Sequence, residues 1–239
     1  MAAQLRISAK TLGGMAMPDF CPRCFWLKLH AGSLPFQVFP GIFSSIDSYT
    51  KKIIQCYFDG HDCFPSWLNE LGELTGYMEP PHYSRFKVVD PGSGATLWGT
   101  PDGIFIRKDG THVIIDYKTA RYTENQDKLV PMYEVQLNAY ADIGEKSGIV
   151  KPVSGLALVY MEPVTHEVAA TDGANHRHDG FAMGFSARVH RIELKPNVIP
   201  ELMHRANEIY QLVRPPDGVP GCKDCESLDN LVGLIVTKH

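Results

Sequence analysis

The chain has 239 residues, of which 44% are hydrophobic and 21% are charged, and this ordinary globular composition excludes an intrinsically disordered protein. No apolar run is long enough to span a bilayer and the N-terminus lacks a signal-peptide layout, so we expect a soluble, cytoplasmic protein. The net charge of −4 excludes a general basic field that attracts nucleic acid. A local groove can still be basic, and the cations that could line one include Arg6, Lys10, Arg23, Lys28, Lys51, Lys52, Arg85, Lys87, Lys118 and Arg121.

The first half of the chain predicts helices followed by strands. A short helix that Ser8 could cap is expected within residues 1–17, and a long helix over about 42–58, where apolar side chains recur with the helical period. The Gly- and Pro-rich segment that follows has room for one short helix around 67–74. Three strands are then predicted over residues 83–89, 95–106 and 112–118.

The second half of the chain alternates helix, strands and helix. A helix is expected over about 131–146 and a final amphipathic helix over about 197–213. Between them lie a strand over 156–161 and its partner within 181–194. This order of elements predicts a single domain over residues 1–239 with an α/β fold, in which helices flank one central mixed sheet.

Residues 99–118 suggest a site at the end of a hairpin. Two β-branched runs flank an Asp-Gly turn at 109–110, which is a strong hairpin signal. The side-chain period of two places Asp116 and Lys118 on one face of the second strand, where an acid and a base are out of place in a core. Folding the hairpin brings Asp102 beside them. Two carboxylates and a lysine that converge at the end of a sheet predict a divalent-metal site, although an ordinary ion pair beside a turn aspartate is the simpler alternative.

The cysteines form two pairs with metal-ligand spacing, one near each end of the chain. Four thiolates suit either tetrahedral zinc or an iron–sulfur cluster, and joining the pairs would tether the segments of about 1–40 and 214–239. Cys56 and Cys63 lie outside this pattern and are expected to be ordinary thiols. The expected ligands are Cys21, Cys24, Cys222 and Cys225.

Three sequence pieces in order resemble the PD-(D/E)XK nuclease superfamily. They are Gly99-Thr-Pro-Asp102, then, after 13 residues, Asp116-Tyr-Lys118, and then Gln136-Leu-Asn-Ala-Tyr140, and the last two are similar to the RecB-like branch. The resemblance implies a restriction-endonuclease-like core in which Asp102, Asp116 and the Tyr117 carbonyl hold Mg²⁺ or Mn²⁺. Lys118 would position or activate the attacking water or stabilise charge on the phosphate. Gln136 would orient the water or backbone, and Tyr140 would pack or hydrogen-bond beside the site.

The family usually adds an acidic residue or histidine from a preceding helix. Asp47, on the first long helix near its apolar stripe, matches that position best, and Glu70 and Glu73 are its rivals.

The resemblance also bears on the cysteines. RecB-like nucleases of CRISPR adaptation carry a [4Fe–4S] cluster held by one N-terminal cysteine, often in Cys-Pro-Arg, and three C-terminal ones. Cys21-Pro22-Arg23 is similar to that signature, but this chain has two cysteines at each end. On this basis we favour an iron–sulfur cluster, with zinc as the alternative.

The function expected from the resemblance is that of a metal-dependent DNA nuclease. We expect an exonuclease on single-stranded or end-containing DNA, in repair, recombination, phage or CRISPR-related processing, with DNA as the partner and protein partners undetermined. The alternatives are a non-catalytic nucleic-acid-binding or assembly module that retains the fold, and a zinc-stapled protein with no role on DNA.

Overall fold

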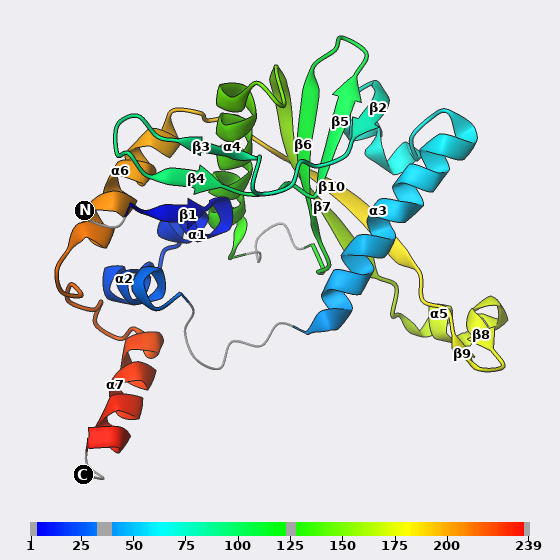
Figure 1. Cartoon of the computed structure of the whole chain (residues 1–239). Coiled ribbons are helices and arrows are strands. Elements are labelled where there is room, and N and C mark those ends of the chain that lie inside the picture. Colours follow the sequence, from blue (N-terminus) through cyan, green and yellow to red (C-terminus); the bar gives the residue numbers. More distant parts are fainter. Residues whose placement is uncertain (1–3, 33–39, 123–127, 237–239) are drawn as a thin grey trace.

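The computed structural model describes residues 4–32, 40–122 and 128–236, and its centre is a five-stranded mixed sheet (Figure 1). β6 pairs in parallel with β7, and the other neighbouring strands pair antiparallel. The strands, in spatial order, are β10 (Phe185–Ile192), β7 (Val153–Pro163), β6 (His112–Lys118), β5 (Gly103–Arg107) and β2 (Leu74–Met78). The predicted α/β fold with a central mixed sheet flanked by helices is therefore confirmed.

Helix α4 (Val130–Ser147) crosses one face of this sheet and connects β6 to β7. Every residue from 135 to 144 is buried, because the sheet covers one side of the helix and other elements cover the opposite side. Ile114 of β6 and Leu158 of β7 belong to the hydrophobic core on this face. The helix α6 (Val198–Gln211) also packs on α4, through a stripe formed by Ile199, Met203, Ala206 and Ile209.

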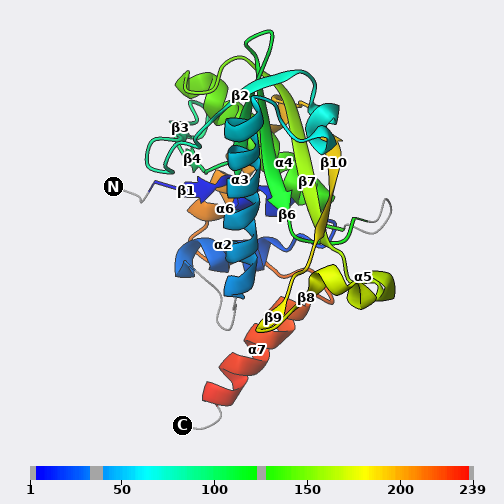
Figure 2. The same cartoon turned by 90° about the vertical axis from the view of Figure 1, so that its right-hand side faces the viewer.

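Helix α3 (Gly41–His61) lies against the opposite face, and Figure 2 shows it in front of the sheet. Alternation along β6 sends Val113, Ile115 and Tyr117 to this face, where they pack with Ile54 of α3. The short 3₁₀ helix η2 (Ser66–Leu71) completes this second core. The two faces of β6 therefore carry the two sets of side chains that the period of two predicts.

A second, three-stranded sheet lies beside α4 and corrects the prediction of one strand over 95–106. That segment forms β4 (Thr96–Trp98) in the small sheet and β5 in the central sheet. Pro101 offers no N–H to a ladder, so the strand ends before it. Gly99 sits so close to Tyr140 that an added Cβ would overlap the ring. The small sheet is completed by β1 (Arg6–Ser8), where only a helix was expected, and by β3 (Lys87–Val89), which is shorter than the predicted 83–89.

The N- and C-terminal segments meet beside α4 and α6. Ser8 caps α1 (Ala9–Gly13) by accepting a hydrogen bond from the Thr11 N–H, as expected, and η1 (Gly14–Ala16) follows. Helix α2 (Pro22–Ala31) contacts α6 and α7 (Lys223–Val236). Helix α7 was not predicted from the sequence, and Figures 1 and 2 show that it extends away from the rest of the protein. Residues 1–3, 33–39 and 237–239 of the two predicted terminal segments lie outside the described residues.

Several element boundaries differ from prediction. The short helix expected around 67–74 is the 3₁₀ helix η2, which ends earlier, at Leu71, because the chain from Leu74 on pairs with β5 as β2. α6 ends at Gln211, which leaves Val213 95% exposed. Between β7 and β10 the chain forms α5 (Glu167–Thr171), η3 (Gly173–Asn175), β8 (His176–Arg177) and β9 (Gly180–Phe181). In the described part of the chain, no helix has the length and apolarity needed to cross a membrane.

The close approach of α1 to α4 gives a test of the packing. A Cβ added at Gly13 would overlap the Met132 carbonyl oxygen, whereas one added at Gly14 would meet nothing within 4 Å. Both glycines have right-handed helical dihedral angles, so they differ mainly in the available room. We expect Gly13→Ala to lower the free energy of unfolding by about 1–3 kcal/mol through overpacking against backbone. Urea denaturation measures this.

The matched control is Gly14→Ala, which we expect to leave stability unchanged or to raise it by less than about 1 kcal/mol. Equal effects of the two substitutions would contradict this packing of α1 on α4.

Candidate active site and cysteine cluster

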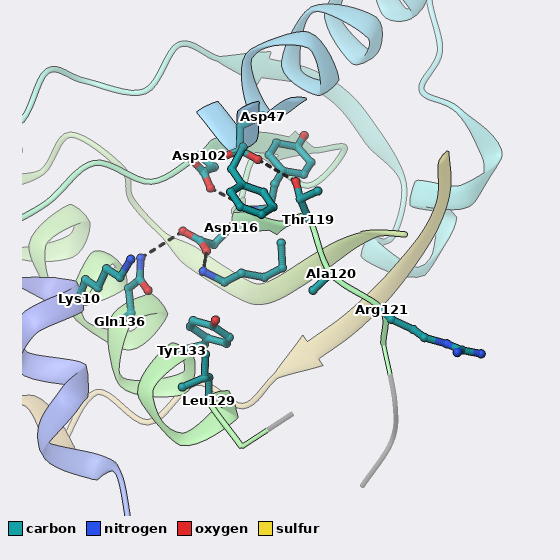
Figure 3. A pocket seen from close by; sticks show the side chains of 13 residues that line it. Lys10, Asp47, Asp102, Asp116, Thr119, Ala120, Arg121, Leu129, Tyr133 and Gln136 are labelled. Atoms are coloured by element: carbon teal, nitrogen blue, oxygen red, sulfur yellow. Dashed lines mark hydrogen bonds and ion pairs between the residues drawn. The ribbon is translucent and has the colours of Figure 1, made fainter. Parts of the chain in front are cut away.

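A polar pocket of about 490 Å³ opens at the C-terminal end of β6 (Figure 3). Its walls come from α1, α3, the start of β5, the end of β6 and the first turns of α4. The ionisable and polar residues that face it are Lys10, Asp47, Asp102, Asp116, Lys118, Thr119, Arg121, Tyr133 and Gln136. The fold thus brings together acids that are far apart in the sequence.

Asp116 is the most enclosed acid of the pocket, with 4% of its surface exposed. Its Oδ2 forms an ion pair with the Lys118 ammonium, and its Oδ1 accepts a hydrogen bond of 3.2 Å from the Gln136 side-chain amide. Burial, reinforced by the nearby Asp102 carboxylate, raises the pKa of Asp116 to about 6 despite the opposing effect of Lys118. The Lys118 ammonium also lies 3.8 Å from the ring centroid of Tyr133, so a cation–π contact fixes its direction.

Asp102 lies opposite Asp116 because β5 and β6 pair with Gly103 next to Ile115. Its Oδ2 accepts a hydrogen bond of 3.0 Å from the Tyr117 N–H, and its Oδ1 lies 2.8 Å from the Lys51 ammonium. The Tyr117 side chain points to the other face, into the second core. The hairpin therefore juxtaposes the two carboxylates and Lys118, as its Asp-Gly turn suggested.

Gln136 projects from α4 toward the end of β6 and is 5% exposed. Its amide nitrogen donates to Asp116 and, at 2.9 Å, to the Tyr140 hydroxyl oxygen. Its Oε1 is buried and has no hydrogen-bond partner among the described residues. Tyr140 itself lies one turn further along α4, behind the pocket wall and against Gly99, and burial raises the pKa of its hydroxyl. Gln136 is thus held on one side and offers an unused acceptor.

Asp47 faces the same pocket from α3, and the Thr119 hydroxyl donates to its Oδ1 at 3.2 Å. Burial and the Asp102 carboxylate raise the pKa of Asp47, which is the effect expected of a third acid in a crowded site. Its rivals lie elsewhere. Glu73 pairs with Lys108 at the far end of the hairpin, and Glu70 is exposed.

The residues of the pocket fit a hard divalent cation. Carboxylate oxygens from Asp47, Asp102 and Asp116 are the donor type that Mg²⁺ and Mn²⁺ prefer. Three carboxylates in a partly buried pocket also repel one another: burial is the main cause of the raised pKa values of Asp47 and Asp116, and the Asp102 carboxylate adds to it. A bound dication would relieve it.

Four residues of the site were given no specific role from the sequence. Lys51 and Lys10 were expected only as general groove cations, yet Lys51 binds Asp102 and Lys10 lines the pocket. Thr119 follows the Asp-Tyr-Lys element and Tyr133 lies on the same helix face as Gln136, and they contact Asp47 and Lys118. A local signal existed for Tyr133, since it precedes Gln136 by one helical turn.

The four expected cysteine ligands form a compact cluster near the two ends of the chain. Their sulfur atoms all lie within 4.8 Å of one another, with Cys24 at 3.4 Å from Cys225 and 3.7 Å from Cys222, and Cys21 at 3.6 Å from Cys225. Cys21 directly precedes α2 at its N-cap position, and Cys225 lies in the first turn of α7. The helix amides and dipoles there favour thiolates.

Electrostatics within the cluster favour one ionised thiol. Burial opposes ionisation of Cys21, but hydrogen bonds from the backbone of Cys24 and Val219 outweigh it and lower its pKa to about 6. Burial and the neighbouring sulfur atoms raise the pKa of Cys24. Arg23 and Asp229, bridged by two hydrogen bonds of 2.9 and 2.5 Å, join α2 to α7 beside the cluster. The residues therefore form a ready four-sulfur ligand set between two helices.

Comparison with known proteins identifies the family. One solved structure, described as "Crystal structure of SSO0001", is similar to this chain with 14% sequence identity and a TM-score of 0.39. The similarity covers 90% of this chain and 81% of that chain. No curated protein matches the sequence significantly. The family profile of the PD-(D/E)XK nuclease superfamily matches residues 62–229, a range that contains Asp102, Asp116, Lys118 and Gln136. Because this match spans more than half of the chain, the protein belongs to the PD-(D/E)XK nuclease superfamily.

Proposed function

We propose that the protein is a divalent-metal-dependent deoxyribonuclease whose active site is the pocket at the end of β6. The observation that carries the proposal is the convergence of Asp102, Asp116, Lys118 and Gln136, from two strands and a helix, in one pocket of a superfamily member. Asp47 is proposed as the third acid. Exonuclease action on single-stranded or end-containing DNA, and a role in repair, recombination, phage or CRISPR-related processing, remain predictions.

Each residue has a role that its contacts support. Asp102 and Asp116, with the Tyr117 carbonyl and Asp47, would hold Mg²⁺ or Mn²⁺, which supplies charge neutralisation at the phosphate and a more acidic water. Lys118, aligned by Asp116 and Tyr133, offers its ammonium to charge that develops on the phosphate. Gln136 directs its unused Oε1 to accept a hydrogen bond from the attacking water. Tyr140 positions Gln136 through its hydroxyl.

The pocket favours catalysis over a non-catalytic module. Asp116 is a buried acid whose pKa is raised by burial and by the nearby Asp102 carboxylate, and the pKa of Asp47 beside it is raised in the same way. Perturbed acids grouped in a cleft are typical of active sites.

We propose a structural metal at the four cysteines, and the sulfur spacing favours a single tetrahedral zinc ion. Thiolates at about 2.3 Å from zinc lie about 3.8 Å apart in a tetrahedron. Three of the six sulfur–sulfur separations, at 3.4 to 3.7 Å, are close to that edge, and the other three are at most 4.8 Å. The four thiolates of a [4Fe–4S] cluster bind four different irons and stand farther apart, because the cluster body lies between them. The iron–sulfur cluster is therefore the alternative for this site.

Removal of the central acid or base tests the nuclease proposal. We expect Asp116→Asn and Lys118→Met each to lower the rate of cleavage of end-labelled DNA, with Mg²⁺ or Mn²⁺, by about a hundred-fold or more. The matched control is Lys108→Ala, which removes a lysine from the exposed end of the same hairpin and should leave the rate unchanged. Circular dichroism checks that the variants fold. Undiminished cleavage by both site variants would contradict the assignment.

The contact of Lys51 with Asp102 predicts competition with the metal. The ammonium occupies Asp102 Oδ1 at 2.8 Å, so a cation that binds this oxygen must displace it. We expect Lys51→Met to tighten Mn²⁺ binding by about two- to five-fold, the range of a partly exposed ion pair, as measured by calorimetry. Lys52→Met, on the exposed side of the same helix, should not change the affinity. Weaker Mn²⁺ binding by Lys51→Met would show that Lys51 supports the metal site instead.

Substitution of a cluster cysteine tests the structural metal. Cys24→Ser should release the metal and lower the free energy of unfolding by about 2 kcal/mol or more, because energy of metal binding to the folded state is folding energy. Cys56→Ser, at an exposed thiol, should retain both metal and stability. Elemental analysis is expected to give one zinc per chain. Iron with acid-labile sulfide would identify the cluster instead.

A further inference from the structure

A second cavity, of about 700 Å³, adjoins the catalytic pocket at the end of β6. The two cavities share Phe43 of α3 and the segment 119–121, which leaves β6 directly after Lys118. Beyond this shared wall, the second cavity is enclosed by α3, the end of β7 and the start of β10. A polymer with one repeating unit in the catalytic pocket can therefore place a neighbouring group in the second cavity.

The lining of the second cavity differs from that of the catalytic pocket. Its walls are apolar, and polar groups from Arg121, Glu162, His166 and Ser186 lie among them. Met183, which is 43% exposed, is one of the apolar side chains that line this cavity. The apolar wall consists of Phe43, Ile46, Val164, Met183 and Phe185. Such a lining suits a flat apolar group with polar edges far better than it suits a phosphate.

We propose that this cavity, the base pocket, receives an unpaired nucleobase next to the phosphate that is cleaved. This inference rests on the proposed nuclease function and narrows its substrate to single strands or unpaired ends. Bases within a duplex are stacked and paired, and they enter a side pocket only after they leave the stack. Apolar and aromatic side chains that contact successive bases are the usual way to bind single strands without reading their sequence.

The contacts at the junction favour a nucleic acid over a protein segment. Arg121 stands between the two cavities, its side chain is 81% exposed, and its guanidinium lies 3.2 Å from the Glu162 carboxylate. An exposed ion pair of this kind is weak, so a phosphate can take the place of Glu162 at little cost. Figure 3 shows Arg121 directed away from Asp116. In a nucleotide, the charged phosphate is joined through its sugar to a flat base. A cation next to an apolar cavity is complementary to that combination.

Equilibrium binding of a fluorescent single strand tests the base pocket. The full chain carries Asp116→Asn to prevent cleavage, and Ile46→Ala with Met183→Ala removes part of the apolar wall. We expect the affinity to fall about five-fold or more. The matched control is Phe181→Ala, since Phe181 belongs to the same segment between β7 and β10, is 78% exposed and does not line the cavity. Met183→Trp, which adds a stacking surface, should raise the affinity.

A strand with one abasic nucleotide, moved along the sequence, separates base contacts from general weakening. At one position, the abasic strand should bind the chain that carries only Asp116→Asn as weakly as the intact strand binds the Ile46/Met183 variant. When the abasic strand and the variant are combined, the two losses of affinity should not add. Three results would each overturn the base pocket. They are equal binding of the strand by the Ile46/Met183 variant and the Phe181 control, additive losses of affinity at every abasic position, and binding of a duplex as tight as that of the single strand. If the native chain still cleaves DNA in that case, the nuclease proposal stands; if it neither binds nor cleaves, both fail.

Discussion

The parallel pairing of β6 with β7 is the constraint on which the site depends. Two parallel neighbours cannot be joined by a tight turn, so the chain must cross a face of the sheet, and α4 is that crossover. Because α4 covers the face that carries Ile114 and Asp116, Gln136 meets Asp116 at the end of the strand. The antiparallel β5–β6 hairpin then adds Asp102 from the other side. Sheet topology, rather than any loop, aligns the central residues.

The balance of charge in the pocket explains how three acids coexist there. Asp116 is paired with Lys118 and Asp102 with Lys51. Asp47 accepts a hydrogen bond from the Thr119 hydroxyl, and its raised pKa makes its neutral form more accessible. These ammonium groups offset repulsion that would otherwise oppose folding. In the proposed nuclease, a dication would replace the two ammonium groups at the carboxylates with the same total charge, and the released lysines would then be free to pair with a phosphate.

The cysteine cluster joins chain segments that lie next to the same pocket. Cys21 and Cys24 begin α2, Cys222 and Cys225 precede or begin α7, and their cluster closes a loop that contains the whole central sheet. Lys10 of α1 lies between the two regions, because it lines both the pocket at the end of β6 and a cavity beside Cys21 and Cys24. A metal at the cysteines would thus hold α1 and α2 in place next to that pocket, and its contribution to stability would be larger because the loop it closes is long.

Local patterns in the sequence determined much of this protein. The Asp-Gly turn and the period of two placed Asp116 and Lys118 on one face, helical spacing aimed Gln136 inward, and the Cys-x-x-Cys pairs marked the cluster. Each of these depends on neighbours within about one turn of helix or one hairpin. Only the tertiary structure divided residues 95–106 between two sheets, distinguished Asp47 from Glu70 and Glu73, joined Lys51 to Asp102 and formed the second cavity. The small sheet packs beside α4, and the other three features arise where α3 crosses the central sheet. A contact between elements so far apart in the chain leaves no periodic trace in either of them.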